Sequence, residues 1–471
     1  MKRRQFLGRS FWLGGGLIAL GNKMLAFDGK KTIRGRVTGG GRRLKAVVIS
    51  DGYNLVATDS EGQYEIEPHP LARHLFVCTP AGYAFLQENS IARHYTTLDA
   101  VRKKKTWDIE LSPLPKDDHQ HQFIIWADPQ VKNEKDVKKM MEQSVPDVKK
   151  WAGSSAEPAL LHGITVGDIV WDTPELFPEY NKAVGEMGIP FFQCLGNHDM
   201  DYEQGGDESS DRSFQKMYGP SWYSFNRGKA HYVILDDVRY LGKGREYDGY
   251  ISKAQLDWLA KDLEFVPKEN LIILCVHIPV HNGVKNNKDL YTILGQRNVH
   301  IMSGHTHYHR NVIQGNIFEH NHGTVCGAWW TGPICGDGTP NGYGVYEVDG
   351  TELRWRYQAT GKKENYQMKA FVNDLDESHK QLLVNIWNHD PAWSTELIAD
   401  GTPLGSLEQI TAFDPDAYDT LLGPEKPKSR GFAEPRKTEH LFQKKIPAST
   451  RELIVKATDR FGKQFTLTKK L

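Results

Sequence analysis

The sequence lacks a surplus of either sign of charge. Lys and Arg together number 59, and Asp and Glu also number 59, so the formal net charge is zero when histidine is neutral. Proteins that bind duplex nucleic acid or an anionic membrane usually carry a basic excess. The balance therefore argues against such polyanions, and we expect no duplex nucleic acid among the partners.

Cysteine is scarce, and its spacing excludes two classes of small scaffold. The five cysteines are scattered and contain no Cys-x-x-Cys pair. This pattern is not that of a disulfide framework or a zinc ribbon. Cys326 and Cys335 flank a Trp-rich loop, and the sequence leaves open whether they pair or stay as buried thiols, the second being favoured.

Long hydrophobic runs are missing as well. The run from Phe11 to Leu20 is too short for a bilayer, which takes about 20 residues, and no other stretch qualifies. Residues 1–27 start with Lys2-Arg3-Arg4 and have the layout of an export signal that is removed from the mature protein. Arg3-Arg4 followed by Phe6-Leu7 favours a twin-arginine signal over an ordinary secretory one, so we expect a periplasmic or extracellular protein.

What the sequence does contain is a chain too long for one core. At 471 residues, several domains are expected. Short alternating runs with Gly-rich turns and no helix of useful length predict a β-sandwich at residues 28–115. Within it, residues 57–64 resemble a signature of transthyretin-like and carboxypeptidase-regulatory-like modules. From about residue 363 to residue 471, β-type runs return and predict a C-terminal β-rich domain.

Between them, residues 116–362 alternate buried strands with helices, which predicts an α/β domain. The expected strands are Phe123 to Ala127, Ile164 to Val166, Phe191 to Leu195, Tyr232 to Leu235, Leu271 to Val276 and Val299 to Met302. The expected helices are Glu134 to Trp151, Pro174 to Met187 and Ser252 to Phe265, the last with Ser252 as its N-cap.

Polar motifs follow these apolar runs, at the strand ends where α/β folds build ligand sites. They are Asp128-Pro129-Gln130, Gly167-Asp168, Gly196-Asn197-His198-Asp199, His277 and Gly304-His305-Thr306-His307. Carboxylates, amides and imidazoles suit a pair of hard or borderline divalent metals, whereas a structural zinc site favours thiolates.

At these motifs, over roughly Gln122 to Tyr357, the chain resembles the calcineurin-like metallophosphoesterase family. The resemblance implies a four-layer α/β/β/α catalytic domain with two divalent metal ions, which supply a water nucleophile for phosphate ester hydrolysis. It also implies the metal ligands. One set is Asp128, Gln130, Asp168 and His307, and the other is Asp168, Asn197, His277 and His305, so that Asp168 is shared.

The chain departs from the family pattern at Gln130, where the family usually has histidine. An amide oxygen can still ligate a hard cation, so manganese, iron or magnesium is expected to compete with zinc there. Trp171 stands where purple acid phosphatases, a branch of the family, have a tyrosine ligand, so no phenolate charge-transfer colour is expected.

The resemblance also assigns a catalytic histidine. His198 is expected to face the phosphate and to stabilise or protonate the leaving oxygen, with Asp172 or Asp199 orienting its ring. The substrate is expected to be a small phosphate monoester or diester, such as a nucleotide, a sugar phosphate or a lipid head group. The alternative is a non-catalytic protein that binds the envelope or a glycan and retains the fold, which Gln130 alone supports.

Two neighbouring segments stay open to two interpretations. Trp329 and Trp330 either shape a leaving-group pocket or pack against a flanking domain. The polar segment from Tyr202 to Arg212 either caps the site or is a solvated loop, and the loop is favoured.

Overall fold

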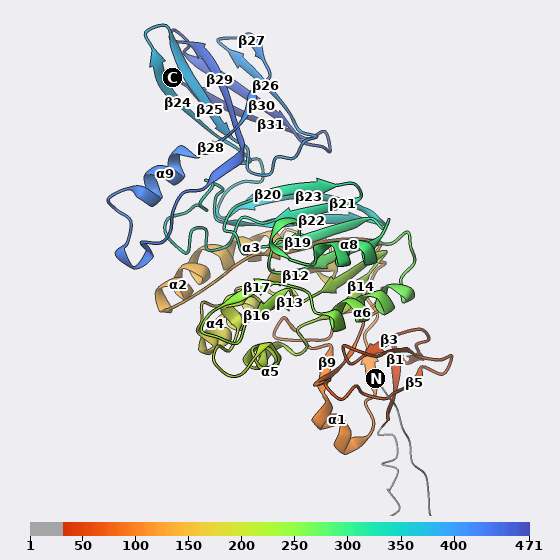
Figure 1. The fold of residues 1–471 in the computed structure, drawn as a ribbon. Coiled ribbons are helices and arrows are strands. Elements are labelled where there is room, and N and C mark those ends of the chain that lie inside the picture. Colours follow the sequence, from red (N-terminus) through yellow and green to blue (C-terminus); the bar gives the residue numbers. More distant parts are fainter. Residues whose placement is uncertain (1–31) are drawn as a thin grey trace, which may run out of the picture. The chain divides into compact units, whose positions relative to one another are not determined.

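Three groups of β-sheets follow one another along residues 32–471, the part of the chain that the computed structural model describes (Figure 1). The export signal predicted at residues 1–27 lies outside the described residues. Within residues 32–471, no helix is long and apolar enough to cross a membrane.

The first group is two small sheets that enclose a core of aliphatic side chains such as Val37, Ile49 and Leu75. One sheet holds β1 (Ile33–Gly39), β2 (Arg42–Arg43), β5 (Gln63–Ile66) and β10 (Ile109–Leu111), and the other holds β3 (Val48–Ser50), β4 (Leu55–Ala57), β6 (His74–Val77) and β9 (Tyr95–Thr97). The β-rich N-terminal fold is confirmed.

The prediction that this region has no useful helix is wrong. Helix α1 (Leu98–Lys104) follows β9, and the Thr97 side chain caps it by accepting a hydrogen bond from the Ala100 amide. Leu98 and Val101 are buried, so one face of this short helix closes the N-terminal core. With only one turn of apolar spacing, the helix has almost no periodic signal in the sequence.

The second group is a pair of larger sheets. The seven-stranded sheet runs β23 (Glu352–Ala359), β22 (Gly342–Asp349), β11 (Gln120–Trp126), β12 (Leu161–Val166), β13 (Phe191–Cys194), β8 (Ile91–Ala92) and β7 (Gln87–Glu88). The six-stranded sheet runs β14 (Tyr223–Arg227), β15 (Ala230–Ile234), β18 (Leu271–Cys275), β19 (Val299–Ser303), β21 (Ile317–Asn321) and β20 (Arg310–Gln314). A hairpin of β16 (Val238–Tyr240) and β17 (Tyr247–Gly249) stands apart.

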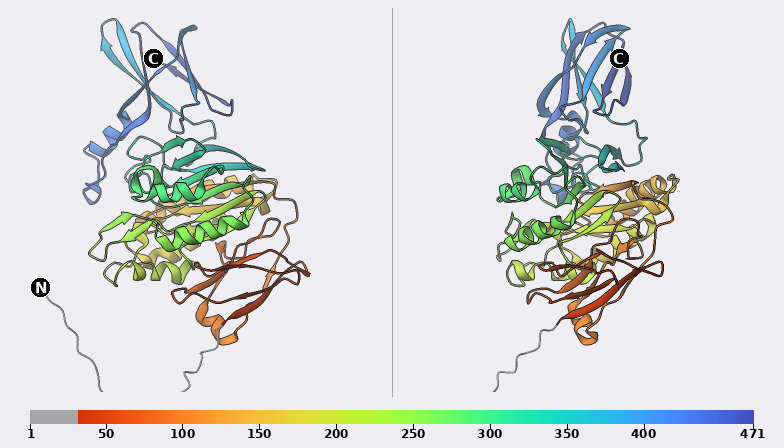
Figure 2. Two further views of the ribbon diagram at one scale, coloured as in Figure 1. Left: turned by 45° about the vertical axis from the view of Figure 1, so that its right-hand side comes forward. Right: turned by 90° about the vertical axis from the view of Figure 1, so that its right-hand side faces the viewer.

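The two sheets pack face to face through aromatic side chains. Phe192 of β13 stacks on Phe225 of β14 with ring centroids 3.8 Å apart, and Phe123 of β11 meets Tyr232 of β15 edge-on at 5.4 Å. Helices α2, α3 and α4 lie beyond one sheet, and α6 and α8 lie beyond the other (Figure 2). This is the four-layer arrangement that the family resemblance implies.

The helices of this region are short. They are α2 (Glu134–Lys139), α3 (Val145–Gly153), α4 (Phe177–Met187), α5 (Arg212–Tyr218), α6 (Lys253–Asp262), α7 (Val280–Gly283) and α8 (Asn287–Leu294). The helix predicted from Glu134 is present, but a π-helical turn at Met140–Ser144 divides it. Pro146 lacks an amide proton, which explains a change of hydrogen bonding at this point. Ser252 caps α6 as predicted.

The third group is a C-terminal sandwich of two antiparallel sheets. One sheet holds β24 (Lys369–Asp376), β25 (His379–Asn385), β29 (Lys437–Pro447) and β28 (Glu408–Phe413), and the other holds β27 (Thr402–Gly405), β26 (Ser394–Ala399), β30 (Glu452–Thr458) and β31 (Gln464–Lys470). Helix α9 (Pro415–Leu422) leads into a long connection to β29. The expected β-rich end of the chain is confirmed.

Candidate metal centre

The motif residues meet because parallel strands end at one edge of each sheet. Strands β11, β12 and β13 are parallel in one sheet, and β15, β18 and β19 are parallel in the other. Five of them end just before a motif, at Trp126, Val166, Cys194, Cys275 and Ser303. The carboxyl ends of the two sheets therefore bring the polar loops together.

The backbone is strained where these loops begin. Asp128, Gln130, Asp168, His305 and His307 all have positive φ, between 41° and 71°. Such angles are uncommon for residues other than glycine and persist only where the surroundings enforce them. The folded chain thus aims these side chains inward at a conformational cost.

Two motif glycines are required by close approach. A Cβ at Gly167, where φ is +83°, would lie 2.4 Å from Nδ1 of His277. A Cβ at Gly304 would lie 2.4 Å from Oδ2 of Asp128. Both distances are far below van der Waals contact, so a side chain at either position would displace an adjacent polar residue.

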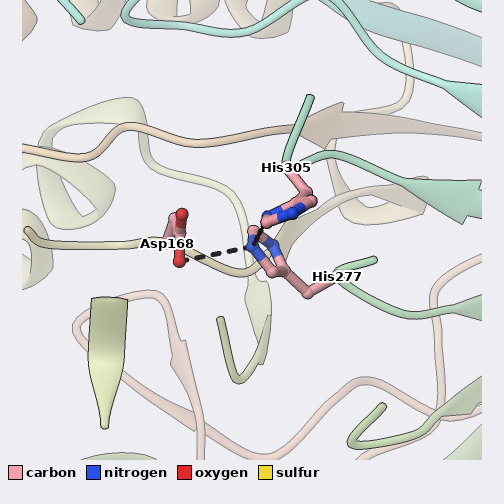
Figure 3. A group of neighbouring side chains, drawn as sticks. All are labelled: Asp168, His277 and His305. Atoms are coloured by element: carbon pink, nitrogen blue, oxygen red, sulfur yellow. Dashed lines mark hydrogen bonds and ion pairs between the residues drawn. The ribbon is translucent and has the colours of Figure 1, made fainter. Parts of the chain in front are cut away.

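The core of the site is a cluster of the buried Asp168 and His277 with the partly buried His305, whose ligand atoms all lie within 4.8 Å of one another (Figure 3). Nε2 of His277 lies 3.3 Å from Oδ1 of Asp168 and 3.1 Å from Nδ1 of His305. It also lies 3.0 Å from Oδ1 of Asn197. Four predicted ligands therefore converge on one point.

This convergence favours a cation. The other ring nitrogen of His277, Nδ1, lies 2.9 Å from the carbonyl oxygen of Val166, which only accepts, so Nδ1 carries a proton. In a neutral ring, Nε2 then presents a lone pair toward a carboxylate, an amide oxygen and another imidazole. A proton on Nε2 can serve one of these acceptors, whereas a divalent cation serves them all.

The charges of the cluster lead to the same conclusion. Burial lowers the pKa of His277, but the nearby carboxylates of Asp168 and Asp128 outweigh burial and raise it to about 10. Burial raises the pKa of Asp128 to about 8. Burial and the neighbouring His277 lower the pKa of His305 to about 3. Without metal, the carboxylates thus stabilise a proton on His277, in the place where a cation would be bound.

The predicted ligand set of Asp128, Gln130, Asp168 and His307 lies beside this cluster. Nε2 of His307 is 3.7 Å from Oδ1 of Asp128, and its Nδ1 donates to the Gly327 carbonyl at 2.5 Å, which leaves Nε2 free to bind. Gln130 reaches Asp168, but through its amide nitrogen, with Nε2 3.2 Å from Oδ2. In this orientation Gln130 hydrogen-bonds the shared carboxylate. The buried donor set fits divalent ions by its chemistry.

His198 stands at the edge of this cluster, with 22% of its side chain exposed. Its Nδ1 lies 2.8 Å from Oδ1 of Asp172, and Oδ2 of Asp172 pairs with Arg245 at 2.6 Å. Asp199, the other predicted orienting residue, instead accepts from the amides of Val170 and Gly196. Asp172 is therefore the residue that the structure places against His198.

Burial lowers the pKa of His198, but the charges of Asp168 and Asp172 outweigh it, so the pKa is raised above its ordinary value. A proton on this ring is then stabilised at the mouth of the site, where a substrate oxygen would arrive.

Sequence patterns missed several residues near the centre. Arg245 and Tyr247, whose ring lies 6.0 Å from that of His305, come from the β16–β17 hairpin. Cys326 lies 3.6 Å from Nδ1 of His307. Their positions depend on folding of distant segments, and no motif spacing marks them. Cys326 and Cys335 are separate buried thiols, as favoured.

The two segments left open by the sequence each contact the site, through Trp329 on His307 and through the Tyr202 hydroxyl, which donates to the Asn197 carbonyl. Trp329 stacks on His307 with ring centroids 4.2 Å apart and also meets Phe432 of the C-terminal region. Packing against a flanking domain is thus confirmed for Trp329, and the leaving-group pocket stays a prediction. The favoured solvated loop from Tyr202 to Arg212 is wrong for Ser209 and Ser210, which are buried.

Three individual proteins are similar to parts of this chain. The chain is 28% identical over 131 residues to a protein of Arcobacter nitrofigilis named a probable glycerophosphodiester phosphodiesterase, a match that covers 26% of this chain and 44% of the relative. Among solved structures, a dimetal phosphatase from Danio rerio aligns with 51% of this chain and 96% of its own at 12% identity and a TM-score of 0.39. A purple acid phosphatase from yellow lupin, Lupinus luteus, aligns with 77% of this chain and 69% of its own at 13% identity and a TM-score of 0.38.

Family models match the chain in three consecutive parts. The model for the N terminal of calcineurin-like phosphoesterase matches residues 31–114, the calcineurin-like phosphoesterase model matches residues 102–309, and the model for the C terminal of calcineurin-like phosphoesterase matches residues 319–465. The central match contains every predicted ligand from Asp128 to His307. The chain therefore belongs to the calcineurin-like phosphoesterase family.

Proposed function

We propose that this chain is a metal-dependent hydrolase of phosphate esters that acts outside the cytoplasm. The observation that carries the proposal is the convergence of Asp168, Asn197, His277 and His305 on one point with their acceptor atoms 3.0–3.3 Å from Nε2 of His277. Family membership supports the phosphoric ester as the substrate bond. The N-terminal signal pattern supports export.

Two divalent ions are proposed to be held around the shared carboxylate. Asp168, Asn197, His277 and His305 would hold one, and Asp128, Gln130, Asp168 and His307 would hold the other. When bound, such ions polarise the phosphate and make a water molecule nucleophilic near neutral pH. Gln130 must turn its amide to present oxygen, and manganese, iron, magnesium and zinc are the candidate metals.

The chain's own residues supply the rest of the chemistry. His198 is proposed to donate a proton to the leaving oxygen from Nε2, while Asp172 accepts from Nδ1 and fixes the ring. Arg245 pairs with the second oxygen of Asp172, which fixes the direction of the carboxylate. No side chain of the chain needs to act as nucleophile.

A small phosphodiester or monoester is the proposed substrate. The name of the Arcobacter relative, a probable glycerophosphodiester phosphodiesterase, supports a glycerophosphodiester-like substrate. The chain spans less than half the length of that relative. The proposed domains are a signal at 1–27, an N-terminal β-sandwich at 28–115, the catalytic domain at 116–362 and a C-terminal β-rich domain at 363–471.

The test is to strip the purified protein of metal and restore manganese, iron, zinc or magnesium singly. Hydrolysis of p-nitrophenyl phosphate and bis-p-nitrophenyl phosphate is then measured, with Asn197→Ala and His198→Ala as site variants. Metal-dependent turnover of one ester that Asn197→Ala loses would support the proposal, whereas His198→Ala tests proton donation and should affect these p-nitrophenyl esters less than alkyl esters. No turnover with any metal would shift weight to a binding protein that retains the fold.

A further inference from the structure

The connection between α9 and β29, residues 423–436, comes from the C-terminal region and is anchored against helix α2 and the loop that contains Gly336. Arg430 pairs with Asp136 of α2 at 2.6 Å, with only 9% and 4% of the two side chains exposed. Further along, the Arg436 amide donates to the Gly336 carbonyl at 2.6 Å. The segment is thus held by a buried ion pair on one side of Phe432 and by a backbone hydrogen bond on the other.

Phe432 completes a group of three rings. Its centroid lies 5.2 Å from that of Trp171 and 5.2 Å from that of Trp329, both in edge-to-face geometry. The two tryptophans are 6.4 Å apart. We call Trp171, Trp329 and Phe432 the aromatic wall. Phe432 is 47% exposed, so part of its ring stays accessible beside the two tryptophans.

The aromatic wall touches the metal centre at two points. Trp329 stacks on His307 at 4.2 Å, with an angle of 25° between the planes. Trp171 lies 5.4 Å from the ring of His198. A phosphate held between the metal ligands and His198 would therefore direct one of its substituents toward these rings.

There is room for such a substituent next to the wall. Trp329 and Phe432, but not Trp171, line a cavity of about 570 Å³ that continues between β20 and the sheet that contains β28 and β29. Its volume is in the range of small-molecule sites. Arg436 and Thr438 also line it and offer hydrogen-bond donors, and Arg310, which pairs with Glu439 at 2.9 Å, lies in the same lining. A ring on the wall would thus have polar groups within the same cavity.

Two cations already lie over the ring of Trp171. The ammonium of Lys132 lies 4.4 Å from the centroid of the Trp171 ring, and the guanidinium of Arg430 lies 5.3 Å from it. These cations already interact with the face of the tryptophan and would repel a quaternary ammonium group. A neutral planar ring meets no such penalty and can pack against Phe432.

We propose that the aromatic wall is a specificity subsite for a planar aromatic ring, an aryl group or a nucleobase, on the second substituent of a phosphodiester. The inference rests on the proposed hydrolase function and narrows its substrate class. Phe432 makes the C-terminal region part of the substrate site.

The test uses diesters that share p-nitrophenol as the leaving group and differ in the other substituent: methyl, phenyl and thymidine. Each variant is scored by its ratio of kcat/KM for the ring-bearing ester to that for the methyl ester. Phe432→Ala is expected to lower this ratio by about three- to tenfold, the range of one aromatic contact. Phe265→Ala is the matched control, since Phe265 is 46% exposed and lines none of this cavity, and it should leave the ratio unchanged.

Phe432→Leu separates a ring from mere apolar area. A lowered ratio in both Phe432 variants supports the subsite, and a ratio that Leu fully restores overturns the requirement for a ring. A loss for thymidine as well as phenyl extends the subsite to nucleobases, and a loss for phenyl alone restricts it to aryl groups. Equal losses for methyl and ring-bearing esters overturn the proposal.

Binding provides a readout independent of turnover. Titration calorimetry with phenyl phosphate and methyl phosphate should show tighter binding of phenyl phosphate to the parent protein, and Phe432→Ala should reduce the difference. Thermal unfolding of each variant confirms that it is folded. Absence of turnover on every ester with every metal would refute the hydrolase itself, whereas turnover without ring preference would refute only the subsite.

Discussion

Replacing Asp172 with Asn tests how His198 delivers its proton. Asp172 is 8% exposed, and its Oδ1 lies 2.8 Å from Nδ1 of His198. Asn keeps the shape but removes the charge that stabilises the protonated ring. A hydrogen bond to a charged group contributes about 1.5–3 kcal/mol, which corresponds to about 10–150-fold in rate if it is lost only when the proton is needed.

The leaving group decides whether that loss is visible. An alkoxide needs a proton as it departs, whereas p-nitrophenolate leaves readily without one. We therefore expect Asp172→Asn to lower kcat for an alkyl phosphate ester by about 10–150-fold and for a p-nitrophenyl ester by less than about threefold. Steady-state kinetics on the two esters with the same metal measures this difference.

Arg245 provides an internal comparison, since it contacts the other oxygen of the same carboxylate. Its side chain is 66% exposed, so its ion pair contributes no more than about 1 kcal/mol. Arg245→Gln should lower alkyl ester turnover by about fivefold or less. An equal effect of Asp172→Asn on both esters would refute proton delivery through His198 and make Asp172 a support of the loop.

The remaining predictions concern stability. Removing divalent metal should lower Tm, and restoring the metal at 100 times its Kd should raise the free energy of unfolding by about 2.7 kcal/mol. Calorimetry that gives the same Tm with and without metal would contradict a metal centre. Arg430→Met should lower the free energy of unfolding by about 3 kcal/mol because Asp136 loses its buried partner, whereas Lys253→Ala at an exposed pair should cost less than about 1 kcal/mol in the same urea titration. Burial lowers the pKa of His94 to about 3, so below about pH 6.5 the unfolded chain binds a proton at His94 that the native chain does not bind. The free energy of unfolding is thereby lowered by about 2 kcal/mol at pH 5. His94→Phe should reduce the fall in urea midpoint between pH 7 and pH 5, and an unchanged fall would refute His94 as its source.

The sequence was informative where the fold and the site depend on residues that are adjacent in the chain. An apolar strand followed directly by a polar motif, as at Gly167-Asp168 or Gly304-His305, carries both the fold and the ligand in a few adjacent residues. The parallel arrangement of β11, β12 and β13 then brings such motifs together without any further information.

Residues that approach from distant segments were not predictable in this way. Phe432 lies more than a hundred residues from Trp329, and its contact depends on the ion pair of Arg430 with Asp136. Arg245 reaches Asp172 from a hairpin that has no ligand motif. These contacts arise from packing between elements, which leaves no periodic pattern in the sequence.

The central claim is that Asp168, Asn197, His277 and His305 surround a divalent cation. Anomalous diffraction from crystals grown with Mn²⁺ tests it most directly. We expect an anomalous peak between Oδ1 of Asp168 and Nε2 of His277, with a second peak beside Asp128 and His307. Crystals that diffract well and show no peak among these four side chains would contradict it.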